Sequence, residues 1–392
     1  MRYLSLPCRV VLMSLALSLW AAADTRSAPA DKDKGNSLRV QLPTSDGIEL
    51  SGTFYPNSGG KKDAVVMLLH NIDPQKGGGS HQDGWDSLAA QLQAQGYAVL
   101  SFDFRGFGSS KTVTTEFWKF PHNQAIRGAR AKPDTIDQKD FPIGYYLSLV
   151  NDIAAARAFL DRKNDARELN TSNLILIGAG EGATLGVLWM AAEMRRQRDL
   201  TPQNLGVDAL GQPIQPLIPK LDDAEGKDLA AGIWLSISPT LGGPNGRPVS
   251  TVLRTDLEDI AREGKVPTIF MYGQKDTKAR DQTLNYLNAV KRGKKGEKIE
   301  LRNTGEKAVA GTELSGSKLL SDRLRTIPFI VDRLNSIMED RGSKEWKKRE
   351  EEKSRYFWSL PSVAVPRTRI PAKVAGEKLS APIPPAVMGF SR

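Results

Sequence analysis

The chain has 392 residues, of which 40% are hydrophobic and 26% charged, which is enough for one large α/β domain with its own core. Its single cysteine, Cys8, excludes a disulfide framework and a thiol-based site in the body of the protein. The formal net charge is +10, but residues 343–392 hold eleven Lys and Arg against five Glu, so the body is nearly neutral and is not expected to bind nucleic acid.

The first 23 residues have the parts of a secretory signal. Arg2 and Arg9 precede an apolar run over residues 10–20, and three alanines ending at Ala23 supply a small-residue cleavage site. The run is shorter than the ~20 apolar residues of a bilayer span, and no later segment exceeds it. We expect cleavage near Ala23, a secreted or periplasmic mature chain without a transmembrane segment, and a polar linker over 24–36. An uncleaved N-terminal anchor is the alternative.

Apolar patterning predicts strands that alternate with helices along the body. The expected strands are 38–42, 48–55, 64–69, 97–102, 173–177, 229–237, 267–272 and 298–302. The expected helices are 85–95, 145–162, one that begins at residues 180–182, 251–262, 277–291 and 319–338. The first two strands meet at Asp46-Gly47, a hairpin signal. Such alternation indicates an α/β fold with a mostly parallel central sheet and helices on both faces.

Three segments break this alternation. Residues 112–144 and 200–227 are polar and contain prolines, and we expect both to be insertions above the sheet. The aromatics of the first insertion either line a pocket mouth or cover the sheet edge. Residues 343–392 combine dense charge with six prolines, a composition that predicts a disordered basic tail. The expected organisation is therefore a signal over 1–23, a linker over 24–36, a domain over 37–342 and a tail over 343–392.

Residues 178–182 read Gly-Ala-Gly-Glu-Gly between an apolar strand and a helix start. The pattern matches a nucleophile elbow G-x-S-x-G, in which glycines permit a sharp turn that exposes the middle side chain, except that Gly180 has no reactive atom. The histidines are His70, His81 and His122, and all precede this turn. A hydroxyl nucleophile needs a base within hydrogen-bond reach, so a serine placed elsewhere in the turn would still lack its partner.

The chain resembles the α/β-hydrolase superfamily, in its serine-esterase and dienelactone-hydrolase-like group, over roughly residues 48–338. The segments that carry the resemblance are the strand ending in His70-Asn71, the D-x-R-G-x-G-x-S turn at residues 103–110, the elbow at 178–182, and the strand end that delivers Asp276. The resemblance implies an α/β-hydrolase fold and a triad at Gly180, Asp276 and Ala310, where Ala310-Gly311-Thr312 looks like the family's His-Gly-Thr. Two of these three positions are empty, so no catalytic residue set is intact.

The former crevice still offers candidate ligand-binding residues, which are His70, Asn71, Gly180, Glu181 and Asp276. Glu181 is expected to complement the dipole of the helix that follows the elbow. The alternative is that Glu181 and Asp276, together with Asp103, ring the crevice and bind a cation or a basic ligand.

Several other polar residues have simpler interpretations. Asp103 is expected to brace its own turn against Arg105, and His70 to be a satisfied loop residue. His81 and His122 have no second ligand at metal spacing, so neither a metal nor a cofactor is expected.

Three hypotheses of function follow. The first is a secreted, non-catalytic α/β-hydrolase-like protein that binds a small molecule or an envelope partner through the former crevice or the tail. The second is an active carboxylic-ester hydrolase with a non-standard constellation, for instance Glu181 activating water. The third is an envelope-associated structural protein whose basic tail, residues 343–392, binds an anionic polymer.

Overall fold

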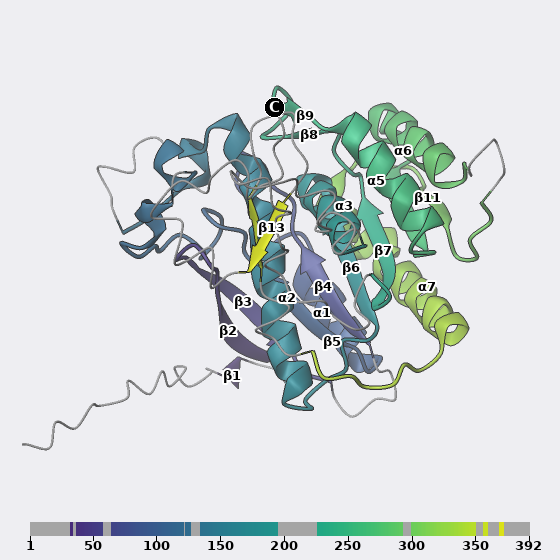
Figure 1. The fold of residues 1–392 in the computed structure, drawn as a ribbon. Helices are drawn as coiled ribbons and strands as arrows, with labels where there is room; N and C mark the ends of the chain where they lie inside the picture. The colour runs from purple at the N-terminus through teal and green to yellow at the C-terminus, as the bar shows by residue number, and fades with distance from the viewer. Residues whose placement is uncertain are drawn as a thin grey trace, which may run out of the picture. The chain divides into compact units, whose positions relative to one another are not determined.

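A mostly parallel β-sheet forms the centre of the molecule (Figure 1). The computed structural model describes residues 32–33, 37–57, 64–120, 122–126, 134–194, 226–292, 299–349, 356–359 and 368–371. Within these residues nine strands are ordered β1-β2-β3-β5-β4-β6-β7-β10-β11. Their bounds are Lys32–Asp33 (β1), Ser37–Pro43 (β2), Glu49–Tyr55 (β3), Val65–Leu69 (β4), Ala98–Phe102 (β5), Leu174–Ala179 (β6), Leu229–Leu235 (β7), Thr268–Gly273 (β10) and Gly305–Val309 (β11).

The sheet pairs antiparallel at its N-terminal side and parallel elsewhere. Strands β2 and β3 form the hairpin predicted at Asp46-Gly47, with Pro43 opposite Glu49, and β3 pairs antiparallel with β5. The neighbours from β5 to β11 are all parallel. This arrangement, with helices on both faces, is the α/β-hydrolase fold expected from the sequence.

Helices bury both faces of the sheet (Figure 1). The helices are α1 (Trp85–Ala94) and α7 (Thr326–Arg341) on one face, and α2 (Val150–Asp165), α3 (Gly180–Met194), α5 (Ser250–Arg262) and α6 (Thr277–Val290) on the other. Alternate residues of β4 enter the two cores, with Met67 packed among residues of the α3 side and Val66 and Leu68 among those of the α1 side. Because both faces are covered, the central strands are continuous apolar runs.

A buried ion cluster joins the turn between β2 and β3, the turn after β5, and α2. Arg105 is fully buried and donates from Nη1 to Asp46 Oδ2 at 2.5 Å and from Nε to Asp152 Oδ1 at 2.7 Å. The expected contact between Asp103 and Arg105 is therefore wrong. The carboxylate of Asp103 instead accepts from the backbone N–H of Ser80 and Ser109. Arg105 reaches past its own turn because Asp46 and Asp152 together neutralise it in an interior where an unpaired charge is very costly.

The first insertion contains short 3₁₀ turns. These are η1 (Phe117–Lys119), η2 (Asn123–Ala125) and η4 (Gln138–Asp140). Phe117 and Phe120 are buried, at 0% and 5% exposure, and Phe117 belongs to the core on the α3 side of the sheet. The second insertion, 200–227, lies mostly outside the described residues.

Some element boundaries differ from those expected. A 3₁₀ segment, η5 (Ile143–Leu149), precedes α2, and the last strand is β11 rather than 298–302. Residues 299–302 are not a strand. The edge strand β11 exposes Glu306, Lys307 and Ala308, as edge strands often do to prevent pairing with another chain, so it lacks the apolar signal of a buried strand. A small hairpin of β8 (Thr240–Leu241) and β9 (Arg247–Pro248) was not anticipated.

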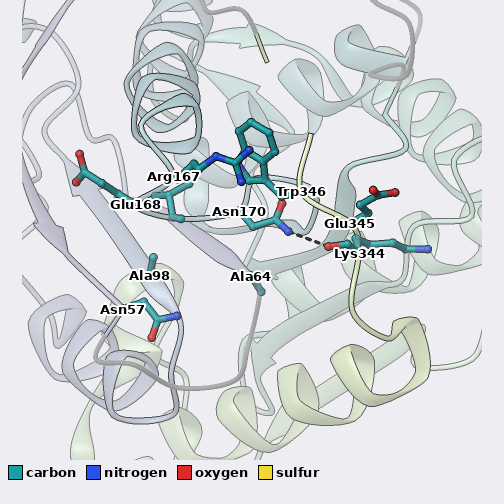
Figure 2. A pocket seen from close by; sticks show the side chains of 10 residues that line it. Asn57, Ala64, Ala98, Arg167, Glu168, Asn170, Lys344, Glu345 and Trp346 are labelled. Atoms are coloured by element: carbon teal, nitrogen blue, oxygen red, sulfur yellow. Dashed lines mark hydrogen bonds between the residues drawn. The ribbon is translucent and has the colours of Figure 1, made fainter. Parts of the chain in front are cut away.

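The chain continues past α7 as a strap, residues 343–349, that lies against the domain near the amino ends of β4, β5 and β6. Side chains of the 164–172 region bind its backbone, with Asn170 Nδ2 donating to Lys344 O at 2.8 Å and Ser172 Oγ donating to Glu345 O at 2.9 Å. The guanidinium of Arg167 lies 4.0 Å from the ring centre of Trp346, and Figure 2 shows this pair beside a cavity of about 460 Å³.

Two further strands occur within the tail, β12 (Tyr356–Ser359) and β13 (Thr368–Pro371), which pair antiparallel. The predicted signal over 1–23, most of the linker over 24–36 and most of the tail beyond residue 349 lie outside the described residues. Among the described residues, no helix has the length and apolar composition needed to cross a membrane.

Candidate functional site

The turn from β6 into α3 is the sharp strand-to-helix connection predicted from residues 178–182. Gly180 opens the helix with a φ of +52°, in the left-handed region that favours glycine. The outer glycines serve close packing. A Cβ on Gly178 would lie 2.7 Å from Ala183 Cα, and one on Gly182 would lie 2.1 Å from the carbonyl oxygen of His70. The sharp strand-to-helix turn therefore forms with a glycine at its middle position.

The side chain of Asn71 occupies the place that a nucleophile would take. A Cβ built on Gly180 would lie 1.9 Å from Asn71 Oδ1, far inside van der Waals contact. The same amide approaches Gly316, since a Cβ built there would lie 3.7 Å from Asn71 Cγ. The partly exposed amide of Asn71 therefore lies next to two glycines of distant segments, Gly180 and Gly316.

Asp276 and Ala310, the two other positions that the resemblance assigns to a triad, lie in different local environments. Asp276 caps α6, and its Oδ1 accepts from the backbone N–H of Ala279 at 3.0 Å. Ala310 is exposed and directly follows β11, and the next residue, Gly311, donates its N–H to Gln274 Oε1. The loop after β11 crosses the end of β10, where Lys275 N donates to Thr312 O at 2.8 Å. The loop after β11 therefore lies next to the end of β10, as the resemblance implies. Ala310, at the position where the resemblance places a histidine, cannot act as a general base.

Glu181 is buried and fixes the β8–β9 hairpin above the elbow. Its two carboxylate oxygens accept from the backbone N–H groups of Gly242 and Gly243, at 2.8 and 2.7 Å. Burial raises the pKa of Glu181 to about 7, while these two hydrogen bonds act in the opposite direction. The expected interaction with the dipole of α3 is compatible with this geometry, but the hairpin contact is the stronger restraint. Both oxygens are engaged, which leaves little freedom for activating water.

The three histidines lie in separate environments. In His70, Nδ1 is 2.7 Å from the carbonyl oxygen of Asn71 and Nε2 accepts from the N–H of Phe104 at 3.0 Å, so the ring is neutral and fully used. Burial lowers the pKa of His70 further. His81 pairs with Asp86 at 2.7 Å, and His122 pairs with Asp46 at 3.0 Å. In the described part of the chain, no three His, Cys, Asp or Glu side chains are grouped so that they could hold a metal ion.

The structure brings together only some of the predicted ligand-binding residues. Asn71 and Gly180 are in contact, His70 packs beneath them through its backbone, and Glu181 follows in the first turn of α3. Asp276 points its carboxylate into its own helix terminus, so the ring of Glu181, Asp276 and Asp103 carboxylates does not form a site. Gly242 and Gly243 form a glycine pair, which is a turn signal in the sequence. This signal could have pointed to the turn whose backbone N–H groups bind Glu181.

Comparisons with known proteins give distant similarities only. No protein-family model matches the chain. The curated "Uncharacterized protein YfhR" of Escherichia coli O157:H7 is 28% identical over 132 residues, covering 32% of this chain and 45% of that protein. The protein of the same name from strain K12 is 29% identical over 117 residues, covering 28% and 40%. This chain therefore spans less than half the length of the curated relatives that it matches.

Solved structures with a similar arrangement include several hydrolases. The Pyrococcus furiosus esterase Pf2001 covers 80% of this chain and 96% of its own, with 13% identity and a TM-score of 0.45. A dienelactone hydrolase from Anabaena variabilis covers 79% and 99%, with 12% identity and a TM-score of 0.43. A structure from work on two Rhizomucor miehei esterases covers 80% and 87%, with 13% identity and a TM-score of 0.47. At these identities the similarity concerns the fold alone.

Proposed function

We propose that this chain is an exported α/β-hydrolase-like protein that does not hydrolyse esters and acts by binding. The observation that carries the proposal is the contact between Gly180 and Asn71, because an added Cβ would lie 1.9 Å from Asn71 Oδ1. A side chain at position 180 would require Asn71 to move, Asp276 caps a helix, and the position where the resemblance places a histidine is the exposed Ala310.

The geometry around Glu181 argues against a hydrolase with a substitute base. A pKa of about 7 suits proton transfer at neutral pH, but a general base also needs an oxygen within reach of a water molecule that faces the substrate. Both oxygens of Glu181 are held by backbone N–H groups of the β8–β9 hairpin. The raised pKa follows from burial and needs no catalytic explanation.

Assays of ester hydrolysis and of serine labelling on purified residues 24–392 test this proposal. We expect no turnover of short-chain nitrophenyl esters and no labelling by a fluorophosphonate, with an active esterase of the same fold as the positive control. Background catalysis from an oxyanion hole alone is only ~10³ to 10⁴ over water. Stoichiometric labelling at a serine would refute the proposal. So would an efficient esterase made by Gly180→Ser alone, since a functional base would then have to exist.

The tail is the stronger candidate for attachment, because the amide of Asn71 lies next to Gly180 in the crevice. Residues 343–392 hold eleven basic residues, of which four lie in the strap. Seven of the eleven lie beyond residue 349; in the strap Arg349 is only 8% exposed, whereas Lys344, Lys347 and Lys348 are exposed. The proposed partner is an anionic envelope polymer, with the salt dependence that such binding shows.

Co-sedimentation with envelope material tests this attachment. The mature chain and a truncation ending at Arg349, which retains the strap, are compared at low and high salt. We expect only the mature chain to sediment, and only at low salt. Equal, salt-insensitive sedimentation of both would exclude the tail.

A further inference from the structure

Another cavity, of about 210 Å³, lies where the edge strand β11 meets the start of α7. Apolar side chains form part of its wall, and they include Met271, Val309, Leu324 and Phe329. The remainder is mostly cationic, from Lys307 on β11 and from Arg323 and Arg325 just before α7. No carboxylate lines it.

The three cations are solvent-exposed, and the structure shows no acidic partner for them among the residues that it describes. Among the described residues, none of Lys307, Arg323 and Arg325 forms an ion pair, and the ammonium of Lys307 instead lies 5.1 Å from the ring centre of Phe329. Cations that surround one small space repel each other unless an anion lies between them. A hollow lined by a single sign of charge, with apolar walls, concentrates ligands of the opposite sign.

The start of α7 adds further hydrogen-bond donors to this wall. The helix is 16 residues long and begins at Thr326, and Arg325 precedes it with a φ of +50° and provides no side-chain cap. Thr326 lines the cavity at 3% exposure, and its Oγ1 has no hydrogen-bond partner among the described residues. The backbone N–H groups of Thr326 and Ile327 in the first turn are donors that suit an oxyanion, and Pro328 supplies none.

We propose that this cavity binds a small organic acid, an oxyanion carried on a short aromatic or aliphatic stem. The oxyanion lies against Arg323, Arg325 and the start of α7, and the stem packs on Val309 and Phe329. A cavity of roughly 150 Å³ holds benzene, whereas drug-sized ligands occupy roughly 300–1,000 Å³. The volume of about 210 Å³ therefore suits a phenyl-sized stem and is too small for a polymer. This site is independent of whether the protein hydrolyses esters.

Calorimetric titration of the mature chain tests the proposal, with benzoate and phenyl phosphate as the probes. We expect saturable binding at one site, and the tighter of the two identifies the acid as a carboxylate or a phosphate ester. Benzylamine, which has the same ring and the opposite charge, is expected not to bind. Inorganic phosphate, which lacks the stem, is expected to bind at least tenfold more weakly than phenyl phosphate.

Variants locate the site. Arg323→Gln and Arg325→Asn, the latter tolerant of the left-handed conformation, are each expected to weaken binding roughly tenfold, as for the loss of one charge-assisted hydrogen bond. Lys318→Gln removes the same charge from an exposed position outside the cavity and is expected to leave Kd within about twofold. The proposal is overturned if neither acid saturates the protein, if benzylamine competes equally, or if both arginine variants bind like the parent while remaining folded.

Discussion

Replacing Gly180 by alanine tests directly whether Asn71 contacts the elbow. Two costs are expected to add. The left-handed φ of +52° costs an alanine about 1–2 kcal/mol. A methyl group 1.9 Å from Asn71 Oδ1 also forces the partly exposed Asn71 amide into another rotamer, which adds about 0.5–1 kcal/mol. We therefore expect Gly180→Ala to lower the free energy of unfolding by roughly 1.5–3 kcal/mol in urea denaturation of residues 24–392.

Two comparisons separate these costs. Gly311 has a φ of +71° and no atom within 4 Å of an added Cβ, so Gly311→Ala reports the backbone cost alone. In the background of Asn71→Ala the steric cost disappears, and Gly180→Ala is expected to cost no more than Gly311→Ala does. The resulting coupling between positions 71 and 180 is expected to be about 0.5–1 kcal/mol, the cost of moving the Asn71 amide. Costs that add within about 0.3 kcal/mol would contradict a contact between the two positions.

Three further predictions concern stability. Burial raises the pKa of Glu181 in the folded protein from 4.5 to about 7, so its contribution to stability is fully present below pH 4.5 and is lost as the pH rises through 7. The free energy of unfolding of the parent, relative to Glu181→Gln, is expected to fall by roughly 2–3 kcal/mol between pH 4.5 and 8. A difference that does not change with pH would contradict the burial argument. A chain that ends at Gly342 lacks the strap, and its free energy of unfolding is expected to be about 3 kcal/mol lower than that of a chain that ends at Arg349. The chain that ends at Arg349 is expected to match the parent in the same urea titration. Equal denaturation midpoints for the two truncated chains would show that the strap contacts do not stabilise the domain. Arg105→Met leaves two buried carboxylates without their cation and is expected to cost about 3–5 kcal/mol by denaturation, whereas a cost below about 1 kcal/mol would mean that water reaches the cluster.

The fold could be predicted because most of its strands are buried on both faces. The run at Val65–Leu69 is apolar at every position, and each residue enters one of two cores, so the pattern has no other good explanation. The edge strand Gly305–Val309 has three exposed residues and no such pattern. The alternating apolar residues Ile299 and Leu301 therefore led us to predict a strand over 298–302, but residues 299–302 do not form one.

The sequence predicted only those features of the candidate site that depend on which amino acid stands at a position. Gly180 and Ala310 have no side chain that could act as a nucleophile or a base, so the resemblance implied an incomplete triad. The contact between Asn71 and Gly180 joins residues from two strand ends and could not be inferred. The partners of Glu181 and Arg105 were missed for the same reason, because burial selects partners from distant segments rather than from neighbours in sequence.

The strap also determines when folding can finish. Its hydrogen bonds join Trp346 to Asn164 and Asn164 to Lys347, pairs that are 182 and 183 positions apart along the chain. Contacts at such separation form late, and a chain that grows from its N-terminus contains Asn164 long before residue 346 has been added. Until then the polar side chains around Asn164 and Asn170 must be solvated by water. The domain therefore completes the hydrogen bonds of the 164–172 region only after the strap has been synthesised.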